Sequence, residues 1–368
     1  MKVPSVRKSI RRTENLVAIV IQEMADYVIG SVTVTESGET RTKQGVPRIP
    51  GTHSGHTIFL STQNFSGNQD MASYADPVVI APSPTPFTDD DKIDLPAIER
   101  NVEKWIDSPL TGFVLNSENG EETFLSEQER LAIVRTVKAV GGNQKLIVGG
   151  VDNPSVGESL RLAENLVEAG AEMIRVRVPR NHANAAGYFQ EVITRAPAPV
   201  IIIHQMAPGT FLSIPTAIGA SAEVLGDLVS MDNVYGYIAS SDLRFEARVR
   251  TRVPDEKKFM MGNASIILPG IAFGANSACM MLGNVAPQQC HDILTLATAG
   301  NWLEAQAIHR CILEMDWQIL SRGAAGLKAA LNMLGFTAGG PRKPAPECEP
   351  EQVERIRVAM VAANLLTA

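Results

Sequence analysis

Residues 145–178 give the clearest indication of the fold class, and their sequence is KLIVGGVDNPSVGESLRLAENLVEAGAEMIRVRV. Two runs rich in β-branched residues, 145–150 and 173–178, flank an amphipathic stretch at 155–170 that ends in Gly170. Apolar β-branched runs are typical of parallel strands buried on both faces, and a glycine commonly follows the end of a helix. The stretch therefore predicts a strand, a helix, and a second strand parallel to the first.

The same alternation extends outward in both directions, from Asp76 to about residue 300. The predicted strands are 77–81, 112–116, 145–150, 173–178, 199–204, 234–239, 258–263 and 277–283. Another helix is expected over 125–140, where Ser126 and Glu129 have the spacing of a capping box. Eight alternations over residues 76–300 are typical of an α/β protein with a (β/α)8 TIM barrel. An open doubly wound sheet is the alternative, and the absence of a G-x-G-x-x-G motif after the first strand disfavours it.

The two ends of the chain differ from the barrel. Residues 301–368 contain three further helical runs, more than a barrel needs to close, and predict a C-terminal helical region. Residues 1–75 begin with a basic, acid-free segment and continue with a Ser/Thr/Gly-rich stretch that has no helical period. They predict an N-terminal extension, which is a disordered tail, a gene-model artefact or a mitochondrial transit peptide.

Composition excludes several classes of protein. The chain has 40 acidic against 33 basic residues and no basic stripe interleaved with aromatics, so nucleic acid is not an expected partner. No apolar run is long enough to span a membrane. Four cysteines occur singly, which indicates a reducing compartment such as the cytoplasm. Because the chain lacks metal-ligand motifs and a phosphate loop, we expect neither a metal nor a cofactor.

The candidate site residues follow from the barrel rule that active sites lie at the carboxyl ends of the strands. They are Glu118, Asn119 and Glu121 after the second strand, Arg175 and Arg177 in the fourth, His204 and Gln205 at the end of the fifth, Tyr237 and Ser241 in and after the sixth, and Asn263 after the seventh.

Some of these residues also have a structural interpretation. Buried arginines need anionic partners, so Arg175 and Arg177 are expected to pair with Glu118 or Glu121, or with a substrate carboxylate. Glu121 could instead favour the positive end of the following helix. His204 ends a purely apolar run where the strand meets the predicted pocket, and it is the leading candidate for proton transfer.

Several short motifs make the chain similar to the dihydrodipicolinate synthase and N-acetylneuraminate lyase superfamily of Schiff-base aldolases, over about residues 78–345. They are TPF at 85–87, SENGE at 117–121 and NVAP at 284–287. The sequences of residues 112–131 and 326–346 are closest to those of the 4-hydroxy-2-oxoglutarate aldolase branch. The resemblance implies a (β/α)8 barrel with a C-terminal helical region and commonly a homotetramer.

The family's imine-forming lysine does not carry over to this chain. The family motif N-I-V-G-x-K aligns with NVYGYI at 233–238, which places Ile238 at the lysine position. Isoleucine cannot form an imine with a keto acid. The family's proton-relaying tyrosine matches His204, and its carboxylate-binding positions match Glu118 and Asn119, where an ionised glutamate would repel a carboxylate.

Three functions are compatible with these residues. The first is a lyase, isomerase or cyclase that acts on a small-molecule metabolite by non-covalent acid–base catalysis, with His204, Glu118, Glu121 and Tyr237 as catalytic candidates. The second is a Schiff-base-type aldolase of a 2-oxo acid. The third is a non-catalytic metabolite-binding or regulatory subunit, which a pocket closed by arginine–glutamate pairs would favour.

Overall fold

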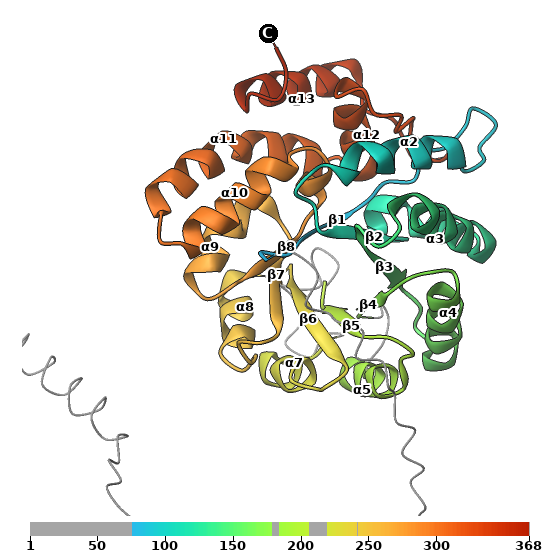
Figure 1. The fold of residues 1–368 in the computed structure, drawn as a ribbon, viewed down its shortest axis with the longest axis vertical. Helices are drawn as coiled ribbons and strands as arrows, with labels where there is room; N and C mark the ends of the chain where they lie inside the picture. Colours follow the sequence, from blue (N-terminus) through green and yellow to red (C-terminus); the bar gives the residue numbers. More distant parts are fainter. Residues whose placement is uncertain (1–75, 179–183, 206–218, 241, 368) are drawn as a thin grey trace, which may run out of the picture. The chain divides into compact units, whose positions relative to one another are not determined.

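The computed structural model describes residues 76–178, 184–205, 219–240 and 242–367, and the expected extension 1–75 and Ser241 lie outside these ranges. Eight parallel strands close into a barrel in sequence order, which confirms the predicted fold class (Figure 1). The strands are β1 (Val79–Pro82), β2 (Gly112–Leu115), β3 (Leu146–Val151), β4 (Met173–Arg177), β5 (Val200–Ile203), β6 (Val234–Ala239), β7 (Lys258–Met261) and β8 (Ser277–Cys279).

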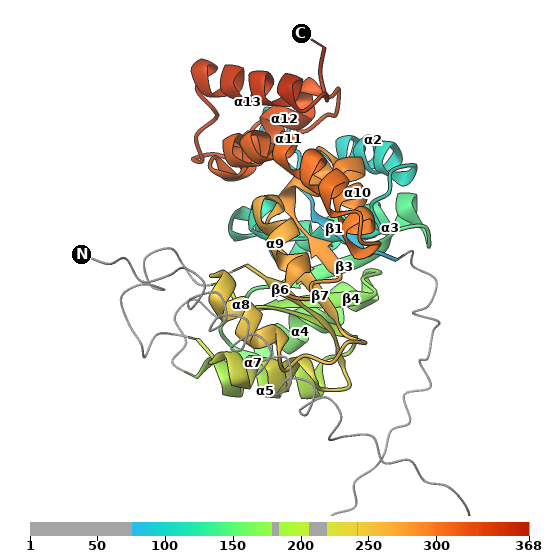
Figure 2. The ribbon, with the colours of Figure 1, turned by 90° about the vertical axis from the view of Figure 1, so that its left-hand side faces the viewer.

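Helices surround the barrel, as Figure 1 shows. Those that follow strands are α2 (Leu95–Ile106), α3 (Glu127–Gly141), α4 (Val156–Glu168), α5 (Ala185–Arg195), α7 (Ala222–Val229), α8 (Leu243–Arg250), α9 (Ile267–Ala272) and α10 (Pro287–Thr298). The C-terminal helices α11 (Trp302–Leu320), α12 (Gly323–Met333) and α13 (Pro350–Ala362) lie on one side of the barrel, beside α10 and α2 (Figure 2). Within the described ranges, every helix is too short or too polar to cross a lipid bilayer.

Local sequence signals account for the helix ends. Ser126 and Glu129 form the predicted capping box, because each side chain accepts a hydrogen bond from the other residue's backbone N–H. Gly170 follows the last turn of α4 with φ +116°, a conformation that side chains disfavour. The predicted strand at 277–283 is too long, since a 3-10 turn at Met281–Asn284 replaces its second half.

The strand residues alternate between two apolar layers. One layer packs between the barrel and the helices and includes Val200 and Ile202 of β5. The other fills the barrel interior and includes Ile201 of β5 and Ile238 of β6. Because successive side chains of a strand point to opposite faces, this alternation decides which residues reach the barrel mouth.

Candidate active site

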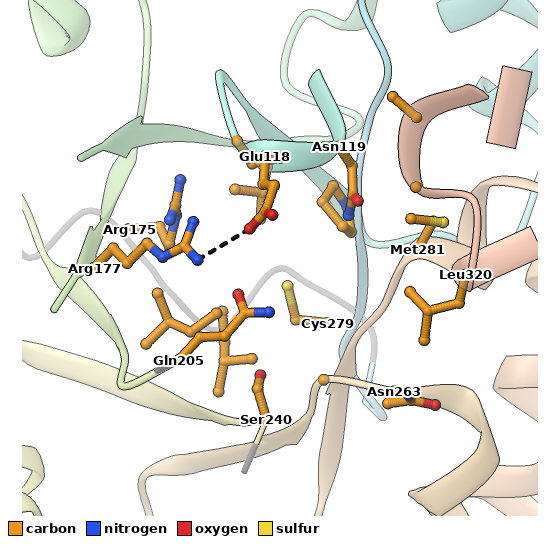
Figure 3. Close-up of a pocket in the computed structure, with 18 residues that line it drawn as sticks. Glu118, Asn119, Arg175, Arg177, Gln205, Ser240, Asn263, Cys279, Met281 and Leu320 are labelled. Carbon is orange, nitrogen blue, oxygen red and sulfur yellow. Dashed lines mark ion pairs between the residues drawn. The ribbon is translucent and has the colours of Figure 1, made fainter. Parts of the chain in front are cut away.

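A cavity of about 290 Å³ opens at the carboxyl ends of the strands. Its apolar lining includes Val114, Ile203, Ile238, Cys279, Met281 and Leu320. Its polar lining comprises Ser117, Glu118, Asn119, Arg175, Arg177, Gln205, Ser240 and Asn263, and Figure 3 shows the two arginines and Glu118 on one side with Gln205 and Ser240 opposite. Six residues predicted to bind or act on substrate therefore meet here: Glu118, Asn119, Arg175, Arg177, Gln205 and Asn263.

Arg177 is the centre of an ion-pair cluster. Its Nη2 lies 2.9 Å from Glu118 Oε2, the pair marked by the dashed line in Figure 3. Its Nη1 lies 3.4 Å from Asp152 Oδ2 and 3.9 Å from Glu122 Oε1. The Arg177 side chain is buried, whereas that of Glu118 is 55% exposed. The expectation that glutamates of the second strand's loop pair with these arginines is confirmed for Arg177 and Glu118.

Arg175 is buried in the same wall with far fewer partners. It lies two residues before Arg177 on β4, so both side chains face the barrel interior. Gly150 on β3 makes room for it, because a Cβ there would lie 2.7 Å from Arg175 Nη2. Only 3% of Arg175 is exposed, and burial lowers the pKa of its guanidinium although Asp152 and Glu122 oppose the shift.

The hydrogen-bonding capacity of Arg175 is largely unused. Within the described residues it forms no ion pair, and its Nε has no hydrogen-bond partner. Its Nη2 donates one long hydrogen bond, 3.4 Å, to the backbone carbonyl of Asn116. A guanidinium carries five N–H donors, and a buried cation without partners is costly. This arrangement can accept an anion supplied from the cavity.

Glu122 lies near Arg177, with Oε1 3.9 Å from Nη1, and is only 2% exposed. Neither carboxylate oxygen has a hydrogen-bond partner among the described residues. Burial raises the pKa of Glu122, and Arg175 is the largest opposing influence. Glu122 is therefore a carboxyl group that can hold a proton close to both guanidinium groups.

Glu121, predicted as catalytic, faces the C-terminal helices instead of the cavity. Its Oε1 pairs with Lys328 Nζ on α12 at 2.5 Å, and its Oε2 accepts the Arg342 backbone N–H at 2.7 Å. Its backbone has φ +60°, which turns the side chain away from that of Glu118. Glu121 thus connects the loop after β2 to the C-terminal region.

His204 does not line the cavity. The inward positions of β5 are Ile201 and Ile203, so the next residue faces the helices. Its Nε2 accepts the Ala220 backbone N–H at 2.9 Å, and its ring stacks on Phe245 with the centroids 5.7 Å apart. Burial lowers the pKa of His204 to about 4, so the imidazole is neutral at physiological pH.

Tyr237 also lies outside the cavity, one residue before the inward Ile238. It is fully buried and packs against Phe259, with ring centroids 5.4 Å apart. Burial, with the nearby Glu246 carboxylate, raises the pKa of its hydroxyl well above the usual value. These contacts place the phenol between β6 and α8 and away from a ligand in the barrel mouth.

The remaining lining residues divide into those that the strand-end rule could have found and those that it could not. Ser240 directly follows β6 and Cys279 ends β8, so their positions in the sequence were sufficient. Leu320, Gly323 and Ala324 come from the C-terminal helices, which carry no local signal for the site. Ile238 lines the cavity at the position aligned with the family lysine, and no lysine is among the described lining residues.

Comparisons with known proteins match the barrel over its whole length. The model of the dihydrodipicolinate synthetase family matches residues 77–363. A 4-hydroxy-tetrahydrodipicolinate synthase from Archaeoglobus fulgidus is 25% identical over 295 residues, 78% of this chain and 99% of the relative. One from Moorella thermoacetica is 26% identical over 287 residues, 77% of this chain and 96% of the relative.

Solved structures show the same fold. The dihydrodipicolinate synthase from Thermotoga maritima superimposes with a TM-score of 0.72 at 20% identity, over 78% of this chain and 99% of that one. The dihydrodipicolinate synthase from Aquifex aeolicus gives a TM-score of 0.71 at 21% identity, over 79% of this chain and 99% of that one.

Proposed function

Because the chain belongs to the dihydrodipicolinate synthetase family, we propose that it is an enzyme of the family's barrel type that binds a small carboxylate metabolite. It acts on this metabolite by non-covalent acid–base catalysis, as a lyase, isomerase or cyclase. By analogy with the homotetramers common in the family, we also propose that it works as a homo-oligomer.

The observation that carries the proposal is the buried Arg175 at the cavity wall. A guanidinium that is 3% exposed, with no ion pair among the described residues, is stabilised when a ligand carboxylate enters and accepts its hydrogen bonds. The lining carries two arginines against one glutamate, Glu118, so the cavity favours an anion.

Glu118 is the base that this geometry supports best. Its carboxylate is open to the cavity, and the Arg177 guanidinium 2.9 Å away holds it in place. In the proposed reaction Glu118 takes a proton from the carbon next to a substrate carbonyl, while Arg175 orients the substrate carboxylate. This role replaces the one expected of His204, which is buried outside the cavity.

Hydrogen-bond donors on the opposite wall complete the proposed site. Asn263 Oδ1 accepts hydrogen bonds from Ser265 N at 2.9 Å and Ser265 Oγ at 2.6 Å, which orients the Asn263 amide and leaves its NH2 group as a donor. Gln205 and Ser240 also line this wall. Such groups stabilise the negative charge that develops on the substrate oxygen when Glu118 removes the proton.

The alternative is a Schiff-base aldolase or lyase of a 2-oxo acid, which the names of the curated relatives favour. Ile238 counts against it, because its side chain lines the cavity where the aligned lysine would form the imine. A non-catalytic subunit is disfavoured by the open volume beside the Arg177–Glu118 pair.

The proposal is tested by calorimetric titration of the full chain with acetate, propanoate, pyruvate and succinate. The Arg175→Met variant should bind these acids about ten- to hundredfold more weakly, because charge-assisted hydrogen bonds contribute roughly 1.5–3 kcal/mol. Arg195→Met, at an exposed arginine on α5, is the control and should bind as the unmodified chain does. The anion site would be refuted if the Arg175→Met variant bound every acid with the same affinity as the unmodified chain.

A further inference from the structure

A second cavity of about 310 Å³ adjoins the first one. It lies between the loop after β2 and the C-terminal region, and both cavities have Glu118, Gly323 and Ala324 in their walls. Each volume alone is near the lower end of the ~300–1,000 Å³ that small-molecule sites occupy. The two cavities together offer room for a ligand considerably larger than a three-carbon acid.

Two of the three residues that line both cavities have small side chains or none. Gly323 and Ala324 begin α12 and carry between them a single methyl group. Glu118 is the third shared residue, and its pairing with Arg177 at 2.9 Å directs its carboxylate toward β4. A ligand anchored in the first cavity therefore meets only small side chains on the α12 side of this shared lining.

One wall of the second cavity is apolar and held in place, although Glu121, Glu122, Thr123 and Arg322 also line the cavity. Phe124 lines it and is 40% exposed, which is unusual for a large aromatic side chain. Pro341, Ala345 and Pro346 line it as well. Arg342 fixes this wall to the loop after β2, because its Nη1 donates to the Phe124 carbonyl at 2.9 Å.

We infer that the second cavity receives the apolar end of the same ligand whose carboxylate binds Arg175. This inference rests on the proposed function and narrows its substrate class to carboxylic acids with an extended apolar or aromatic part. The occupant follows from the three lining residues that the cavities share, since Arg175 lies in the first cavity and the exposed Phe124 in the second. Burying that surface against the ligand removes apolar area from water and strengthens binding.

The test is a titration of the full chain with acetate, phenylacetate, 3-phenylpropanoate, 4-phenylbutanoate and 5-phenylpentanoate. At the chain length that carries the phenyl group past Ala324, the affinity should be about ten- to hundredfold higher than that for acetate. Burial of one aromatic ring accounts for a gain of this size. Ala325→Phe, at a residue that lines the second cavity and not the first, should abolish this gain while leaving acetate binding unchanged. Phe124→Ala should reduce the gain, and Trp302→Ala, at an equally exposed aromatic residue on α11, should not.

The outcomes separate the two proposals. Arg175-dependent binding of acetate without any gain along the phenyl series overturns the inference and leaves the anion site standing. The inference is also refuted if both the Ala325→Phe and the Phe124→Ala variants keep the gain in affinity along the phenyl series. Failure of every acid to bind the unmodified chain overturns the proposed function and the inference together.

Discussion

Arg177 and Glu118 form an ion pair at 2.9 Å in which the cation is buried and the carboxylate is half open to the cavity. Glu118 is not the only acidic side chain paired with Arg177, since Asp152 Oδ2 lies 3.4 Å from its other terminal nitrogen. The charge of Arg177 therefore stays compensated when Glu118 is altered, so catalysis and folding can be tested separately at this position.

Glu118→Gln should lower the rate at which the protein exchanges protons of a bound 2-oxo acid with solvent by about 10²–10⁴-fold, the usual contribution of a general base. The melting temperature should change little. The measurement is exchange of the C3 protons of 2-oxo acids with deuterium oxide, followed by proton NMR. Glu158→Gln is a matched control, because Glu158 is 54% exposed and paired with Arg161 at 2.8 Å on α4. An exchange rate in the Glu118→Gln variant equal to that of the unmodified chain would show that another group is the base.

Reduction with borohydride in the presence of pyruvate or another 2-oxo acid should leave the protein mass unchanged. The reason is that Ile238 lines the cavity at the position aligned with the imine-forming lysine. Intact-protein mass spectrometry checks the result, with a known imine-forming aldolase as the positive control. A stable adduct on a lysine would restore the Schiff-base alternative.

His204→Ala should destabilise the protein by roughly 1–3 kcal/mol, because it leaves the partly buried Ala220 N–H without its acceptor. His204→Gln can supply an acceptor oxygen and should recover part of this loss. Thermal unfolding of both variants measures the effect, and proton exchange of the kind described above should change little in the folded protein. A large loss of exchange without destabilisation would return His204 to the catalytic role predicted from its place at the strand end.

Asp316→Asn should stabilise the protein more at pH 8 than at pH 4.5. Burial raises the pKa of Asp316 on α11 to about 6, while its carboxylate accepts the Ser265 N–H at 3.0 Å. A raised pKa in the folded state contributes stability below the unfolded value, and this stability is lost as pH rises through about 6. An amide that does not ionise avoids this loss, which amounts to up to about 3 kcal/mol.

Unfolding curves of the Asp316→Asn variant and the unmodified chain at the two pH values give the comparison. Asp255→Asn, at an exposed carboxylate, is the control and should change the melting temperature little at either pH. A difference between Asp316→Asn and the unmodified chain that is the same at pH 8 and pH 4.5 would contradict the prediction.

The barrel could be predicted from the sequence because each strand is a short apolar run followed by a helix. The strand expected at 234–239 matches β6 at both ends. The positions of Arg175 and Arg177 were also predictable, since residues two apart on a strand share a face and a buried parallel strand tolerates arginine only near a polar site.

The predictions for His204 and Tyr237 relied on nearness to strand ends and ignored the alternation of the strand. Ile203 and Ile238 are the inward residues, so their neighbours His204 and Tyr237 face the helices. The register between β5 and β6 shifts at Val200 and Ile201, which a count along one strand cannot reveal. The contribution of α12 could not be predicted, because it depends on tertiary packing between distant parts of the chain.

The buried pair of Lys328 and Glu121 constrains how this protein can evolve. Loss of either partner leaves an uncompensated charge in the interior, at a cost of roughly 3–5 kcal/mol, comparable to much of a domain's stability. A descendant can therefore exchange the pair only by changing both codons, and either single mutant is an unfavourable intermediate. Lys328 and Glu121 should accordingly be inherited together, so that the loop after β2 and the C-terminal region diverge as one unit.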